Sequence, residues 1–170
     1  MSGSLFGWDD MSSFAREYLE MSKDVVDGVY ERRWPLPGEK LCIELIAEEE
    51  RATRFFLDVF EGRRSSSVIL GLAPDRKATM QTRRAESALL RVDYTDEPET
   101  MRHRNPDGSV VVGSHVHLDL DGTGAKWAVP LSGQSVIVAD GQASVPGLFW
   151  GFQDACRITN RLSIEQSLGV

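Results

Sequence analysis

Cysteines, long apolar runs and leader-like segments are scarce or absent in this 170-residue sequence. The two cysteines, Cys42 and Cys156, lie far apart and form no C-x-x-C pair, which predicts two buried thiols in a reducing compartment rather than a disulfide framework. No apolar run approaches the roughly 20 residues of a membrane span. The N-terminus also lacks the basic and apolar regions of a secretory leader. We therefore expect a cytoplasmic protein that does not enter the membrane.

Aromatic residues make up only 8% of the sequence, and acidic residues outnumber basic ones to give a net charge of −7. Both features argue against a protein that binds nucleic acid over its whole surface, although they allow a local basic groove. Histidine is rare as well. The only three, His103, His115 and His117, lie within residues 102–128. The sequence contains no clear set of nucleophile, base and acid for covalent catalysis.

The pattern along the chain predicts one α+β domain over residues 1–170, with a short flexible start over 1–10 and a tail over 161–170. We expect a curved antiparallel sheet of about five to seven strands, because short extended segments follow one another through turns without intervening helices. An N-terminal helix and a C-terminal helix are expected to pack on the apolar side of this sheet. The expected strands cover residues 41–47, 53–59, 68–70, 77–83, 88–94, 110–121 and 126–131.

The two helices are predicted from apolar residues at helical spacing. The first is expected to begin at Asp9 or Asp10 and to run to about Gly28. The second is expected to begin after Ser144, a suitable N-cap residue, and to run to about Asn160.

The segment with the histidines predicts a turn followed by a strand. Asn105-Pro106-Asp107-Gly108 has strong turn chemistry, and strict alternation of apolar and polar residues follows it. Alternation places the even-numbered residues from Val110 to Leu120 on a core-facing side and places His115, His117 and the neighbouring aspartates on the other. Two residues along a strand are roughly 6.5–7 Å apart, so both imidazoles can reach one substrate group or one metal ion.

Basic and polar side chains on the two preceding strands extend this face, if those strands lie beside the histidine strand. The combined patch would present Lys77, Gln81, Arg83, Arg91 and Asp93 together with His115 and His117, with His103 at its rim.

Three short motifs carry a resemblance to a known family. They are H-x-N-P-D-G at residues 103–108, G-x-H-x-H at residues 113–117 and K-W-A at residues 126–128. The combination resembles an uncharacterised family of small bacterial and prophage-associated proteins, a domain of unknown function, and the likeness covers roughly the C-terminal half. The resemblance implies a mobile-element or defence setting and brings no activity with it.

The leading functional interpretation is a phosphate-handling or RNA-cleaving, toxin-like protein that uses no metal or other cofactor. His115, His117, His103 and Arg91 would be its catalytic residues, because imidazole titrates near neutral pH and the 2′-OH of RNA supplies the nucleophile. The side chains expected to hold phosphate or a partner are Lys77, Gln81, Arg83, Arg102, Arg104 and Lys126. The expected partners are RNA or a host or phage protein, and the oligomeric state stays open, a homodimer included.

Two other functional interpretations come from different classes. The chain could be a non-catalytic inhibitor or regulator from a mobile element, with the charged face as its contact surface. It could also bind a divalent metal through His115 and His117, with His103, Asp119 or Asp121 as a third ligand. The set with Asp121 resembles cupin barrels, although the downstream histidine of cupins is missing here. In a purely structural alternative, the two histidines pair with Asp93 and Asp119 under a covering helix.

Overall fold

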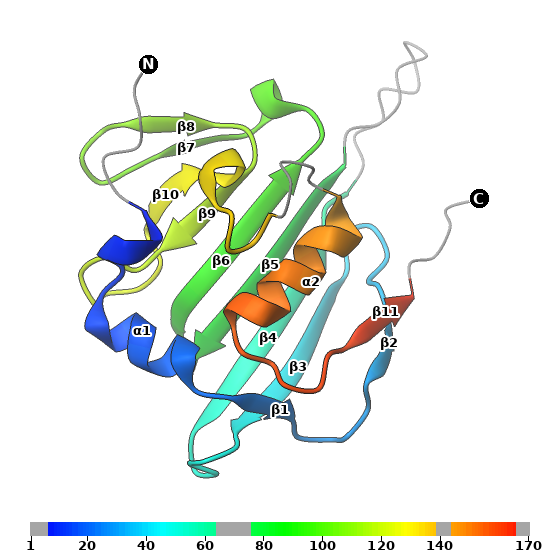
Figure 1. Cartoon of the computed structure of the whole chain (residues 1–170). Helices are drawn as coiled ribbons and strands as arrows, with labels where there is room; N and C mark the ends of the chain where they lie inside the picture. Colours follow the sequence, from blue (N-terminus) through cyan, green and yellow to red (C-terminus); the bar gives the residue numbers. More distant parts are fainter. Residues whose placement is uncertain (1–6, 64–75, 139–143, 166–170) are drawn as a thin grey trace.

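In the computed structural model, residues 7–63, 76–138 and 144–165 are described. They form a seven-stranded antiparallel sheet in the order β1-β3-β4-β5-β6-β9-β10, two short two-stranded sheets and two α-helices (Figure 1). The strands of the large sheet are β1 (Lys23–Val25), β3 (Lys40–Ala47), β4 (Arg54–Glu61), β5 (Lys77–Arg84), β6 (Ser87–Thr95), β9 (His115–Leu118) and β10 (Trp127–Pro130). This arrangement confirms the predicted α+β class.

The centre of the sheet is a meander, because β3, β4, β5 and β6 pair in sequence order. Each of these strands alternates between a core-facing side and a polar side, as the sequence predicts. On β4, Phe55, Leu57 and Val59 are fully buried, whereas Arg54 is exposed on the opposite side. The predicted strand over 68–70 lies outside the described residues.

Both helices cover the apolar side of the sheet (Figure 1). Helix α1 (Ser13–Glu20) contributes Ala15 and Leu19 to the core, and α2 (Val145–Ala155) contributes Leu148 and Phe152. Large apolar side chains of the sheet complete a single hydrophobic cluster between the two layers. The Cys156 thiol is buried in it as predicted, whereas Cys42 on β3, also predicted to be buried, is exposed. The opposite, polar side of the sheet is the side on which the histidines lie. For the described residues, no helix is long and apolar enough to cross a membrane.

The first helix is shorter than the sequence predicted. Its N-cap is Ser12, whose side chain accepts a hydrogen bond from the Ala15 amide, and it ends at Glu20. Residues that were expected to continue the helix instead form β1 at the edge of the sheet, paired with β3. The second helix begins after Ser144 as predicted but ends at Ala155, five residues before Asn160.

The expected tail is partly structured. Strand β11 (Ser163–Glu165) pairs in parallel with β2 (Glu31–Arg33) in a separate two-stranded sheet. Backbone hydrogen bonds from Ser163 to Tyr30 and from Trp34 to Glu165 extend this pairing. Residues 163–165 are therefore fixed by backbone pairing with residues 30–34, which follow β1 in the chain.

The predicted histidine strand is in fact two strands in different sheets. Strand β7 (Arg102–Arg104) and β8 (Val110–Val112) form a hairpin, and the chain then turns at Gly113, where φ is +88°, before β9 begins. This turn changes which side chains face inward. Val111 is buried, whereas Val110 and Val112, predicted to face the core, are 46% and 40% exposed.

Candidate metal centre

Strands β5, β6 and β9 are neighbours on the sheet, as the sequence prediction of one combined polar face required. Gln81 on β5 lies opposite Arg91 on β6, which lies opposite His117 on β9. In the adjacent row, Thr79 lies opposite Asp93 and Asp93 lies opposite His115. Side chains directly opposite on one face have Cβ atoms roughly 4.5–5.5 Å apart, so each row is a line of contacts.

The three histidines converge at one point. The Nε2 atoms of His115 and His117 are 3.0 Å apart. The His103 ring, carried by β7 of the hairpin, packs edge-on against the His117 ring with centroids 4.6 Å apart. One ring nitrogen from each histidine lies within 4.8 Å of the others. The structure thus brings together three of the four predicted catalytic residues.

Asp93 supplies the negative charge of this cluster. Its Oδ2 atom lies 2.9 Å from Nε2 of His117 and 3.4 Å from Nε2 of His115, while its Oδ1 atom accepts hydrogen bonds from Thr79 and Arg91. Burial alone would raise the pKa of Asp93, but its interactions with the His115 and His117 rings, the nearby Arg91 charge and the Thr79 hydroxyl hold this pKa well below its ordinary value. Asp93 is therefore an anion at neutral pH.

Two of the rings have their proton positions fixed by backbone carbonyl groups. Nδ1 of His115 donates to the Gly113 oxygen at 2.8 Å, and Nε2 of His103 donates to the Lys126 oxygen at 3.2 Å, because a carbonyl can only accept. In the neutral rings this leaves lone pairs on Nε2 of His115 and on Nδ1 of His103. Burial lowers the pKa of His117, although Asp93 beside it acts in the opposite direction. The neutral form of His117 is therefore favoured.

The cluster is enclosed, whereas the sequence predicted a polar patch that presents both histidines. His115 and His117 are only 3% and 6% exposed. Among the described residues, His103 of the β7–β8 hairpin packs on both rings. The Asn105 side chain of the same hairpin accepts from the Ala128 amide at 2.7 Å and donates to the Ala128 oxygen at 3.0 Å, which seats the hairpin on the outer edge of β10. His103 then reaches the cluster from that edge.

Arg91, the fourth predicted catalytic residue, adjoins the cluster. The predicted phosphate-binding residues of the sheet lie further away along it, and they are Lys77, Gln81 and Arg83. The Arg91 side chain is 42% exposed beside Asp93. Arg83 forms an ion pair with Asp58 at 2.7 Å, and Gln81 donates to the same Asp58 carboxylate. The ammonium group of Lys77 donates to the Thr100 carbonyl. The basic patch predicted from the sequence is thus dispersed, because Arg91 pairs with Asp93, Arg83 with Asp58 and Lys77 with the Thr100 carbonyl.

The remaining predicted binding residues do not point their charges into the cluster. Arg102 and Arg104 lie on the exposed side of the hairpin, and Arg102 pairs with Glu99. The backbone oxygen of Lys126 accepts a hydrogen bond from His103, while the Lys126 ammonium group donates to the Thr123 hydroxyl. Asp121, the alternative metal ligand, is exposed and accepts hydrogen bonds from Thr123.

The sequence interpretation placed Asp93 on the correct face but did not include it among the site residues. Strand alternation carries the signal for Asp93, because it shares the parity of Arg91 and lies one strand away from the histidines. No sequence pattern predicts that the Gly113 carbonyl accepts a hydrogen bond from His115. Its role depends on the turn that separates β8 from β9.

Comparison with known families places most of the chain in one of them. Residues 12–143 match the model of a family of unknown function, DUF6978. The chain belongs to this family. The match begins well before the C-terminal half on which the sequence resemblance relied and includes all residues of the histidine cluster. Neither the curated proteins nor the solved structures contain a significant match.

Proposed function

We propose that this DUF6978 protein binds a divalent transition-metal ion of the zinc class through His103, His115 and His117, with Asp93 beside them. The observation that carries the proposal is the set of distances among Nε2 of His115, Nε2 of His117 and Oδ2 of Asp93, which are 3.0, 2.9 and 3.4 Å. Ligand atoms about 2.0–2.1 Å from a tetrahedral zinc ion are separated by about 3.3 Å. The two histidine nitrogens and the Asp93 oxygen stand near this spacing, and a ring nitrogen of His103 lies within 4.8 Å of those of His115 and His117.

The hydrogen bonds around the rings support the same proposal. Metal-binding histidines commonly donate their second ring nitrogen to a carbonyl or carboxylate, which fixes the ring and the tautomer. His115 and His103 both do so, to Gly113 and Lys126. Binding would require His117 to carry its proton on Nδ1, because Nε2 faces Asp93 and His115. A neutral His117 and an anionic Asp93 are the protonation states that a metal ion needs.

Metal analysis of the purified protein tests the proposal. We expect a single zinc-class ion per chain after equilibration with Zn²⁺ and removal of excess metal, and loss of that ion in His103→Ala. This variant changes a half-buried residue of the hairpin, so the sheet itself should still fold. Gln81→Ala is the matched control, because Gln81 lies on the same face one strand beyond Arg91. Equal metal content in all three proteins, or none in the wild type, would contradict the proposal.

Metal-independent RNA cleavage in a prophage or defence setting is a second candidate. The position of Arg91 favours it, because this partly exposed guanidinium lies opposite His117 and can hold a phosphate group. The burial of His115 and His117 counts against it, since a general base must come within hydrogen-bond reach of its substrate. Cleavage of total RNA that persists in EDTA and is lost in His117→Ala would favour this candidate. Absence of cleavage and of metal would leave the non-catalytic binder as the interpretation to pursue.

A further inference from the structure

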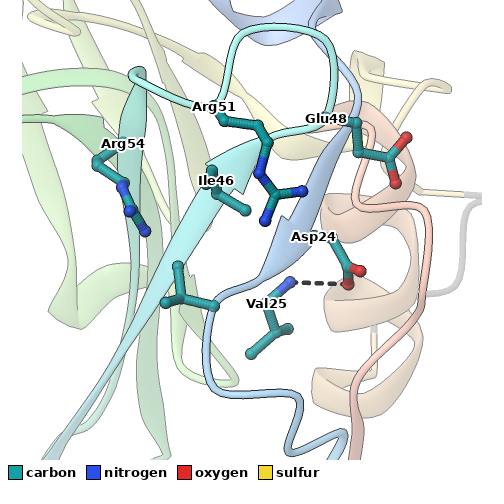
Figure 2. Close-up of a pocket in the computed structure, with 7 residues that line it drawn as sticks. Asp24, Val25, Ile46, Glu48, Arg51 and Arg54 are labelled. Carbon is teal, nitrogen blue, oxygen red and sulfur yellow. Dashed lines mark hydrogen bonds between the residues drawn. The ribbon is translucent and has the colours of Figure 1, made fainter.

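A second candidate site lies on the polar side of the sheet at the edge opposite the histidine cluster. It is a pocket of about 340 Å³ between β1, β3, β4 and the turn that joins β3 to β4 (Figure 2). The pairing register places Asp24, Ile46 and Arg54 in one row across these strands. In Figure 2, Arg54 stands on one side of Ile46 and Arg51 extends from the turn on the other, toward Asp24.

The basic side chains of the pocket have fewer hydrogen-bond partners than its acidic ones. Among the described residues, Arg51 forms neither a hydrogen bond nor an ion pair, and Arg54 has only Glu44 at 3.6 Å, with both side chains nearly half exposed. An exposed ion pair of this kind contributes little to stability, so Arg54 can exchange Glu44 for a ligand.

The two carboxylates of the pocket already have partners. Asp24 accepts hydrogen bonds from the Val25 amide, the Tyr30 hydroxyl and the Asn160 amide group. Glu48 accepts one from the Thr159 hydroxyl. These bonds direct the two acids toward neighbouring segments of the protein. The guanidinium groups of Arg51 and Arg54 remain as the groups best able to bind a ligand.

We propose that this pocket binds a small organic anion, a carboxylate or a phosphate monoester, with a short apolar body. Guanidinium groups match both anions through paired N–H donors. Val26 and Ile46 supply apolar lining for the rest of the ligand, and Val26 is 42% exposed and would be covered on binding. The volume lies at the lower end of the range for small-molecule sites, about 300–1,000 Å³.

Titration of the full chain with four probes distinguishes the ligand classes. The probes are valerate, n-butyl phosphate, inorganic phosphate and uncharged 1-pentanol, followed by amide chemical shifts of β1 and of the β3–β4 turn. We expect saturable shifts with valerate or n-butyl phosphate, and the stronger of the two identifies the anion. Inorganic phosphate should bind less tightly, because it lacks the apolar body. Binding of pentanol as tight as that of valerate, or no saturable shift with either organic anion, would overturn the proposal.

Substitution of the arginines tests whether their charge is the cause. Arg51→Gln and Arg54→Gln should each weaken the organic anion about tenfold, the equivalent of one strong charged hydrogen bond. Both side chains are exposed, so folding should not change. Arg33→Gln on β2 is the matched control and should leave affinity unchanged, because Arg33 does not line the pocket. If Arg33→Gln weakened binding of the organic anion equally, general surface charge would explain the effect, and the proposal of a specific site would be wrong. The outcome is independent of metal binding at the histidine cluster.

Discussion

Lys23 is a fully buried lysine with carbonyl partners in place of a carboxylate. Its ammonium group donates to the backbone oxygens of Leu19, Met21 and Cys156, and so joins the ends of both helices to β1. Burial lowers the pKa of Lys23 to about 8. An unfolded lysine titrates near 10.4, so between these values the unfolded chain holds more protons and stability rises with pH.

This linkage predicts how the free energy of unfolding depends on pH. Across pH 8 to 10 the wild type should gain on the order of 1 kcal/mol per pH unit relative to Lys23→Met, measured by urea denaturation. The comparison with Lys23→Met is needed because burial raises the pKa of the Cys156 thiol to about 12, which lowers stability above pH 9 in both proteins. A difference between the two proteins that stays constant or shrinks over this range would contradict the buried charge.

Single residues show where a sequence interpretation succeeds. Alternation along β6 and β9 was sufficient to place Asp93, Arg91, His115 and His117 on one face, because a strand fixes the side of each residue once one is known. The depth of the same residues was not predictable. The two rings lie against a hairpin whose Asn105 amide group binds the backbone of Ala128, more than 20 residues away.

The β7–β8 hairpin depends on that contact. Asn105→Ala leaves an N–H and a C=O of Ala128 without partners at the edge of the sheet, in a region where both residues are buried. Each unsatisfied buried group costs about 1–3 kcal/mol, so we expect the free energy of unfolding to fall by about 2–4 kcal/mol.

Urea denaturation together with hydrogen exchange at the Ala128 amide measures this effect. Exchange at Ala128 should speed up more than exchange at residues in the centre of β5. Ser109→Ala is the control, because it removes one partner of Asn105 and leaves the bonds to Ala128 in place. If the two variants lose the same stability, the anchoring role of Asn105 is wrong.

Whole elements were predicted less well where tertiary contacts override a local pattern. Residues after Glu20 keep helical spacing, yet they pair with β3, and the β-branched Val25 fits a strand well. Strict alternation also runs through Gly113, but its φ of +88° breaks the strand there, with Pro98 close enough to meet any added side chain at 3.2 Å. Glycine is the residue that adopts such a conformation without strain. Neither the end of the helix at Glu20 nor the break in the strand at Gly113 can be predicted from the periodicity of apolar residues.

At the scale of the molecule, the fold followed from the meander of β3 to β6, since consecutive strands joined by turns pair as neighbours. The position of the hairpin could not be predicted from the sequence. Strands β7 and β8 form a separate sheet, which packs against the edge of the large sheet at Ala128. The histidine cluster lies where these two parts meet. A metal ion there would tie His103 of the hairpin to His115 and His117 of the sheet.

If a metal ion binds there as proposed, it should stabilise the entire chain. At a free Zn²⁺ concentration 100 times its dissociation constant, binding to the folded state alone contributes about 2.7 kcal/mol. For a chain of 170 residues, this corresponds to a rise in melting temperature of about 5–10 °C. Scanning calorimetry with Zn²⁺ and with an equal concentration of Mg²⁺ measures the rise, and Mg²⁺ should produce almost none, because it prefers oxygen ligands. His103→Ala should lose most of the response to Zn²⁺, whereas an undiminished rise in that variant would mean that the ion binds elsewhere and does not join the hairpin to the sheet.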